Sequence, residues 1–248
     1  MAFPTPGTQV DTDFATSVTS MAVNMPATVN SGDLLLSFVS VRNAGTWNTI
    51  PTGWVKIAEQ AGGGSVGETS VFYKIADGTE DGTTPTWITS TATSAAWQVM
   101  RVTSWHGTTP PEVAVTSGDA TAANPPNLAP SFASEDILWV VVAGHSAASA
   151  AAFTAAPTNY TNFANNGASS GGAACSIASA SRQLNAASEN PGTFTAGGSN
   201  RWWASATIAV RPAAAAGSSV KTIDGLAYAS VKTVNGLAIA SVSKINGL

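Results

Sequence analysis

Apolar and polar residues alternate along much of this chain, and a period of two is the pattern of β-strands. The segment Arg201–Arg211 has apolar side chains at every second position, so one face is apolar and the other is mixed. Helical patterns are almost absent, and Gly, Pro, Asn and Asp separate the alternating segments. The sequence therefore predicts an all-β protein. Its clearest strands are expected at residues 34–41, 54–59, 69–76, 96–105, 137–144 and 201–211.

Four short matches relate the first half of the chain to the second. In one match, Ala27–Leu36 resembles Pro130–Trp139 at an offset of 103 residues. The other three have an offset of 106, and they are Pro51–Trp54 with Pro157–Tyr160, Pro85–Trp87 with Pro191–Phe194, and Ala96–Trp97 with Trp202–Trp203. Each match occurs at the same stage of a series of about five strands. We therefore expect two weakly similar pseudo-repeats, at about 20–106 and 123–212.

Residues 1–212 are predicted to form one jelly-roll-like β-sandwich, in which each half threads both sheets. The link at residues 107–126 is punctuated by Pro and holds no long flexible run, which favours a single sandwich. Two tandem small sandwiches are the alternative, because a half of roughly 100 residues is long enough to fold alone.

The last part of the chain repeats every eleven residues, at 220–230, 231–241 and 242–248, after a linker at 213–219. Each copy contains Asp-Gly or Asn-Gly, which favours a tight hairpin because a type I′ turn needs positive φ at both central positions. Such an array has little core of its own, so we expect an assembly or docking element. A meander packed on its own sandwich and a disordered tail are the alternatives. The residues assigned to assembly are Val220, Ile223, Gly225, Leu226, Val231, Val234, Gly236, Leu237, Val242, Ile245, Gly247 and Leu248.

Charge and composition limit the classes of partner that this chain is expected to bind. Charged residues make up 10% of the chain, against roughly 25% in an average soluble protein. No basic stripe is present to neutralise phosphates, so nucleic-acid binding is not expected.

Cys175 is the one cysteine in the chain, so an intrachain disulfide is excluded. Its apolar neighbours are typical of a small buried side chain. The N-terminus lacks the features of a signal peptide and no apolar run approaches the ~20 residues that span a bilayer. Synthesis in a cytoplasm without membrane insertion is therefore expected.

No pattern in the sequence carries catalytic or metal chemistry. His106 and His145 are expected at strand ends, and neither belongs to a cluster with metal-ligand spacing. Glu80 and Asp81 share the polar turn 77–82, whereas a glycosidase needs two carboxylates that face each other across a cleft. The same turn lacks the full register of a calcium loop. No catalytic, cofactor-binding or metal residue is assigned, and the chain is predicted not to be an enzyme.

Eight tryptophans raise the question of sugar binding. Trp54, Trp97, Trp139 and Trp202 fall on expected core faces, and large sandwiches use Trp to fill space. Exposed aromatic rings on a β-sandwich can instead stack on pyranose rings. Trp203 is expected to face away from Trp202 in an ideal strand. The candidates for glycan contact are Trp203, Trp47 and Trp87.

Several segments resemble the small β-sandwich structural proteins encoded by tailed bacteriophages. They are Gly32–Leu36, Pro51–Trp54, Val71–Asp77, Trp203–Pro212 and the eleven-residue tail copies. The resemblance covers roughly residues 20–212 and implies a virion protein on the particle surface, as a head decoration or fibre or as a tail-fibre or adsorption subunit. It implies a homo-oligomer, expected to be a trimer, with other virion proteins and a host-surface glycan as partners. The alternative is a carbohydrate-binding or adhesin module on a bacterial surface.

Overall fold

The computed structural model describes residues 2–43, 45–63, 67–119, 122–147, 153–168, 174–197 and 202–214, together with four two-residue strands nearer the C-terminus. Residues Met1–Ala213 form one compact unit and Ala214–Leu248 form a second. The regular elements of the described residues are β-strands, which turns and loops connect. The predicted all-β sandwich is therefore confirmed.

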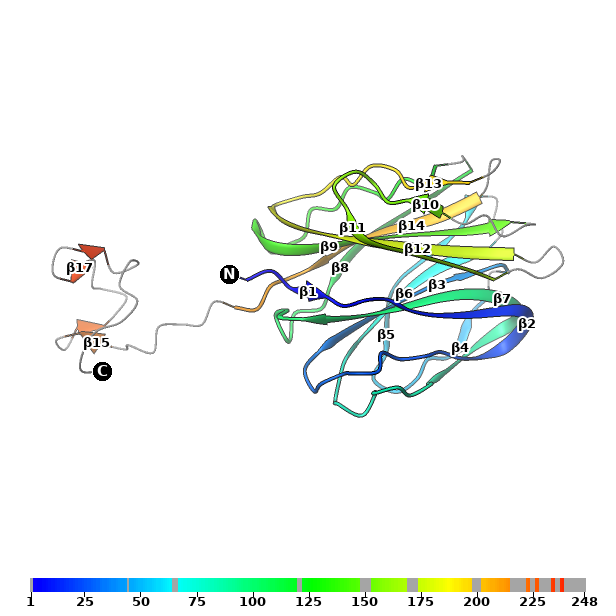
Figure 1. The fold of residues 1–248 in the computed structure, drawn as a ribbon, viewed down its shortest axis with the longest axis horizontal. Coiled ribbons are helices and arrows are strands. Elements are labelled where there is room, and N and C mark those ends of the chain that lie inside the picture. The colour runs from blue at the N-terminus through cyan, green and yellow to red at the C-terminus, as the bar shows by residue number, and fades with distance from the viewer. Residues whose placement is uncertain are drawn as a thin grey trace. The chain divides into compact units, whose positions relative to one another are not determined.

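Two antiparallel sheets face each other in the first unit (Figure 1). One sheet has the order β1-β7-β3-β6-β5, with β2 and β4 also paired to β7. Its strands are β1 Thr5–Pro6, β2 Val10–Ala22, β3 Leu34–Val41, β4 Trp47–Thr49, β5 Val55–Ala61, β6 Glu68–Ile75 and β7 Thr86–Thr103. The other sheet has the order β11-β12-β9-β14-β8. Its strands are β8 Glu112–Gly118, β9 Glu135–Ala147, β11 Thr161–Ala168, β12 Ala174–Ala186 and β14 Trp202–Val210.

Each half of the chain builds one whole sheet, so the expectation that each half threads both sheets is wrong. Strands from residues 5–103 form the first sheet and strands from residues 112–210 form the second. Strands that follow one another in sequence tend to pair or to lie as neighbours, because short connections cost the least entropy. A small outer sheet, β10 Phe153–Ala155 with β13 Thr195–Ala196, also stays within the second half.

The two sheets have the same strand order, and three of their four corresponding ladders have the same register. The order β5-β6-β3-β7-β2 in the first sheet corresponds to β11-β12-β9-β14-β8 in the second. Val39 pairs with Trp97, and His145 pairs with Trp203, so each partner in the second sheet is numbered 106 above its counterpart. The β3–β6 and β9–β12 ladders keep this offset, as do β2–β7 and β8–β14. The sequence match of Ala27–Leu36 with Pro130–Trp139 has an offset of 103 residues, which is three fewer than the offset of 106 between the paired strands.

Contacts between the sheets are reciprocal. Strand β5 lies against β8, and its counterpart β11 lies against β2. Gln60 Nε2 on β5 donates to Ser117 Oγ on β8 at 3.2 Å, and Asn166 Nδ2 on β11 donates to the Thr12 carbonyl on β2 at 2.9 Å. In the ladders, Gln60 pairs with Thr69 and its counterpart Ala168 pairs with Cys175, so Asn166 lies two residues before the counterpart of Gln60. This is the pattern of an isologous, two-fold interface, here formed within one chain.

Apolar residues cover both faces of each sheet. The central cluster, between the sheets, draws on both halves and includes Leu36, Met100, Val140, Cys175 and Ile208. Separate clusters lie on the outer faces, one built from the first half and one from the second. All eight residues of β3 are consequently buried, and six of the eight are apolar. Burial raises the pKa of the Cys175 thiol to about 12, as expected for an unreactive cysteine.

The N-terminal strand, the link between the halves and the end of the sandwich meet at one place. Thr5 pairs with Thr103, and Trp105 bridges to Pro212. The backbone N–H of His106 donates to the carbonyl of Arg211 at 2.9 Å. The chain therefore leaves the sandwich beside the junction of its two halves.

Two short hairpins are described in the second unit. Strand β15 (Thr222–Ile223) pairs with β16 (Leu226–Ala227), and β17 (Thr233–Val234) pairs with β18 (Leu237–Ala238). Each pair flanks two residues, which are Asp-Gly in one copy and Asn-Gly in the next. The third expected hairpin lies outside the described residues.

Candidate functional site

A groove of about 370 Å³ opens on the loops of the first sheet. It lies between the turn that precedes β5 and the loop that joins β6 to β7. Threonine hydroxyls, two prolines, an indole and one ion pair line it. The lining residues are Pro51, Thr52, Trp54, Lys74, Thr79, Glu80, Thr83, Thr84 and Pro85.

The turn at one wall of the groove follows from its sequence. The backbone N–H of Trp54 donates to the carbonyl of Pro51 at 3.1 Å, which closes a β-turn. Gly53 has a φ of 84°, a conformation that glycine adopts without steric cost. The turn directs Trp54 into the outer apolar cluster of the first sheet, where it packs at 5.2 Å from Trp87. Only the edge of this indole reaches the groove, since 7% of it is exposed.

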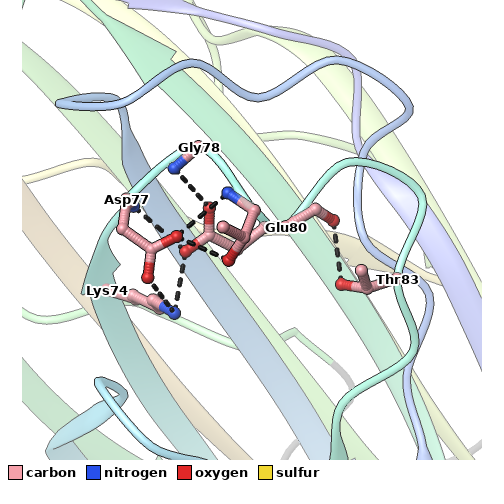
Figure 2. A network of polar contacts seen from close by, with 6 residues as sticks. Lys74, Asp77, Gly78, Glu80 and Thr83 are labelled. Atoms are coloured by element: carbon pink, nitrogen blue, oxygen red, sulfur yellow. Dashed lines mark hydrogen bonds and ion pairs between the residues drawn. The ribbon is translucent and has the colours of Figure 1, made fainter.

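The other wall is held by an ion pair with several hydrogen bonds (Figure 2). Lys74 Nζ lies 2.7 Å from Glu80 Oε1, and both side chains are largely buried. The Glu80 carboxylate also accepts the backbone N–H groups of Asp77 and Gly78 at 3.2 and 3.0 Å. Thr83 Oγ1 donates to the Glu80 carbonyl at 2.8 Å. The loop is therefore folded around one carboxylate.

This network fixes the charge of the groove. Burial alone raises the pKa of Glu80, but the hydrogen bonds from Lys74, Asp77 and Gly78 outweigh burial and hold the pKa below its ordinary value. Two hydrogen bonds from Thr79 lower the pKa of Asp77. The carboxylate oxygens that a calcium ion needs are thus occupied by donors of the loop itself. Among the described residues, no group of three or more His, Cys, Asp and Glu side chains is placed to hold a metal ion.

The second sheet has a counterpart of this arrangement. The N–H of Tyr160 donates to the carbonyl of Pro157 at 3.1 Å, and Asn159 has a φ of 70°. Arg182 Nη1 lies 2.9 Å from Glu189 Oε1, and the Tyr160 hydroxyl donates to the same oxygen at 3.4 Å. An aromatic turn, a cation and a carboxylate thus recur in both halves, and in each half the ion pair joins a loop to the sheet beside it.

Replacing Glu80 by glutamine is expected to lower the free energy of unfolding by about 2 kcal/mol at pH 7, because it removes the charge that Lys74 and two amides stabilise. Since the folded-state pKa is lowered, the carboxylate stabilises the fold above its ordinary pKa of 4.5 and loses that contribution as pH falls through the folded-state value. Urea unfolding followed by tryptophan fluorescence at pH 7 and pH 3 measures the difference. Glu59→Gln, at a half-exposed pair with Lys56, is the control. An equal loss at both pH values contradicts the prediction.

The structure places the predicted tryptophans differently. Trp87 is fully buried and Trp203 is 7% exposed, so neither offers a face for a sugar ring. Trp47 is half-buried, and its Nε1 donates to Ser70 Oγ at 3.1 Å. Trp202, assigned to the core, is instead 42% exposed. Trp203 faces away from Trp202, as expected, but loops cover the outer face of the second sheet and bury Trp203. The expected exposures of the two indoles are therefore wrong.

Several other predicted residues can now be located. His145 lies within β9, buried, with its ring 4.2 Å from that of Phe153, and His106 follows β7 and accepts a hydrogen bond from the N–H of Thr109. Of the assembly residues, Ile223, Leu226, Val234 and Leu237 lie in the paired tail strands. The remaining ones lie outside the described residues, namely Val220, Gly225, Val231, Gly236, Val242, Ile245, Gly247 and Leu248.

Comparison with known proteins gives no relative. No family model matches the chain, and no curated protein or solved structure is significantly similar to it. Within the described residues, no helix is long and apolar enough to cross a membrane.

Proposed function

We propose that this chain is a non-enzymatic structural protein of a bacteriophage particle. It is displayed on the particle surface as a head decoration or fibre, or as a tail-fibre or adsorption subunit. The observation that carries the proposal is the division of the chain into a compact sandwich, Met1–Ala213, and a separate repeated segment, Ala214–Leu248. A folded module joined to a repeated segment suits display and attachment.

The sandwich supports a structural role through the use of its charged groups. Lys74 with Glu80, Arg182 with Glu189, and the bidentate pair of Arg211 with Glu135 each tie a loop or strand end to the sheet beside it. The hydrogen bonds from Arg211 lower the pKa of Glu135. A carboxylate whose pKa is lowered in this way is a poor general acid at neutral pH.

The repeated segment supports assembly. Its described hairpins, β15–β16 and β17–β18, start eleven residues apart and have two residues in each strand. Hairpins of this size bury too little surface to be stable alone and need a partner. Further copies of the chain, expected as a trimer, or other virion proteins can supply that partner.

Removal of residues 214–248 tests the assembly role. The full chain is expected to be oligomeric in multi-angle light scattering, and the 1–213 fragment is expected to be a folded monomer. Thermal unfolding monitored by tryptophan fluorescence shows whether the fragment is folded. The same oligomer with and without the tail contradicts the proposal.

Gold-labelled antibodies against the sandwich test the placement on particles. Label on phage particles supports the virion function, and its position separates a head decoration from a tail subunit. The second candidate function is a carbohydrate-binding or adhesin module, which the exposed indole of Trp202 favours. Label on bacterial cell surfaces and none on particles supports this second function instead.

A further inference from the structure

We infer that Trp202 is a contact residue for a neutral sugar ring, at the end of the sandwich remote from the exit of the tail. The inference deepens the adsorption role proposed above, because it names the class of ligand. It rests on the exposure of Trp202, on its counterpart in the other half, on its surroundings and on its position along β14.

The internal symmetry shows that the fold does not require an indole at this position. The counterpart of Trp202, numbered 106 lower, is Ala96, which is fully buried in the central cluster with Ala168 and Cys175. By contrast, Trp203 corresponds to Trp97, and both are buried. The second half therefore keeps the structural tryptophan and adds an exposed one where the first half uses alanine.

The surroundings hold the indole in place without covering it. Trp202 shares a crevice with Gly62, Thr69 and Ala204. A Cβ atom on Gly63 would lie 3.3 Å from Trp202 Cδ1 and 2.5 Å from the Gly118 carbonyl oxygen, so the backbone packs closely beside the ring. A ring fixed in this way loses little conformational entropy when a ligand binds.

The chemistry of an isolated indole favours a sugar over a protein partner. The face of the ring carries partial negative charge, which attracts the C–H groups on the apolar face of a pyranose. A protein interface needs a contiguous apolar patch. Among the described residues, the other large apolar side chains that remain exposed are Val55 and Ile75. They lie at the ends of β5 and β6 remote from Gly62, so Trp202 belongs to no such patch.

The position of Trp202 suits a surface module. Trp202 begins β14 and Val210 ends it, two residues before the bridge of Pro212 to Trp105. At about 3.4 Å per residue, Trp202 lies roughly 27 Å along the strand from the end at which the chain leaves the sandwich. The indole therefore lies at the end of the sandwich opposite the end from which the chain leaves it.

The test compares the full-length chain with its Trp202→Ala variant on a printed panel of bacterial capsular, O-antigen and cell-wall polysaccharides. We expect at least one neutral glycan to bind, and we expect Trp202→Ala to weaken that binding at least tenfold. Trp202→Phe, which keeps an aromatic face, is expected to retain part of it. Ile75→Ala removes an exposed apolar side chain of similar exposure elsewhere and is expected to bind as the unmodified chain does.

The inference is overturned if no glycan binds the unmodified chain, or if Trp202→Ala binds glycan as tightly as the unmodified chain. It is also overturned if Ile75→Ala weakens glycan binding as much as Trp202→Ala does. Loss of cell attachment with unchanged glycan binding in Trp202→Ala also overturns it, in favour of a protein contact. The outcome is independent of particle labelling. Gold label on particles without glycan binding overturns this inference alone, and glycan binding without label on particles overturns the virion placement alone.

Discussion

Replacing Trp97 by alanine is expected to lower the free energy of unfolding by about 3–5 kcal/mol. Trp97 is fully buried on the outer face of the first sheet. Its ring lies 4.9 Å from that of Trp87, 5.7 Å from that of Trp47 and 6.1 Å from that of Phe72. Removal of the indole leaves a cavity among three other aromatic rings, which cannot close around it without leaving their own contacts.

Urea unfolding monitored by circular dichroism measures this loss, because removing a tryptophan alters the fluorescence signal itself. Trp202→Ala is the matched control, since it deletes the same side chain from a position that is 42% exposed and is expected to lower stability much less than Trp97→Ala does. Equal losses in the two variants would mean that the four-ring cluster does not stabilise the outer face.

The strands that the sequence predicts well are those whose ends are marked by turns. The segment expected at 34–41 is β3, and those expected at 69–76 and 201–211 differ from β6 and β14 by one residue at each end. Alternation of apolar residues and Gly, Pro, Asn or Asp at the ends are local signals, so they can be read without the partner strands. The distribution of strands between the two sheets depends on distant segments, and the expectation that each half threads both sheets was wrong.

The burial of individual side chains is harder to predict in this fold than the positions of the strands. Alternation identifies an inner face when the other face meets solvent, but here loops cover the outer faces of both sheets. Trp202 and Trp203 were therefore assigned to the wrong environments. A correct signal was present, because the match of Ala96–Trp97 with Trp202–Trp203 pairs Trp203 with a buried tryptophan. The internal repeat is a better guide to burial in this chain than periodicity is.

The groove could be predicted only in part. The polar turn at residues 77–82 was expected, and the structure has a loop there. The ion pair of Lys74 with Glu80 joins the end of a strand to the middle of that loop, and no local pattern specifies such a contact. The Pro51–Trp54 turn reaches the groove only through the folding of the sheet. Sites assembled from several loops need the tertiary structure for this reason.

Replacing Gly144 by alanine is expected to lower the free energy of unfolding by about 3 kcal/mol, because the facing sheet leaves no room for an added methyl group there. A Cβ atom on Gly144 would lie 2.2 Å from Thr69 Oγ1 and 2.9 Å from both Cβ and Oγ of Ser40. Neither hydroxyl is free to move away. Thr69 Oγ1 donates to the Ala204 carbonyl at 3.4 Å, and Ser40 Oγ donates to the His145 carbonyl at 3.2 Å. The added methyl group must therefore separate the sheets or break these bonds.

A second substitution distinguishes this clash from a general effect of adding a side chain. Thr69→Ala removes the atom nearest to the new methyl group, so it is expected to restore part of the stability that Gly144→Ala loses. Alone, it should cost about 1 kcal/mol through the loss of one hydrogen bond. A double-mutant cycle by urea unfolding measures the coupling. Strict additivity of the two losses would show that the sheets do not meet at Gly144. Coupling, in contrast, would support the close, reciprocal packing through which two similar halves form one sandwich.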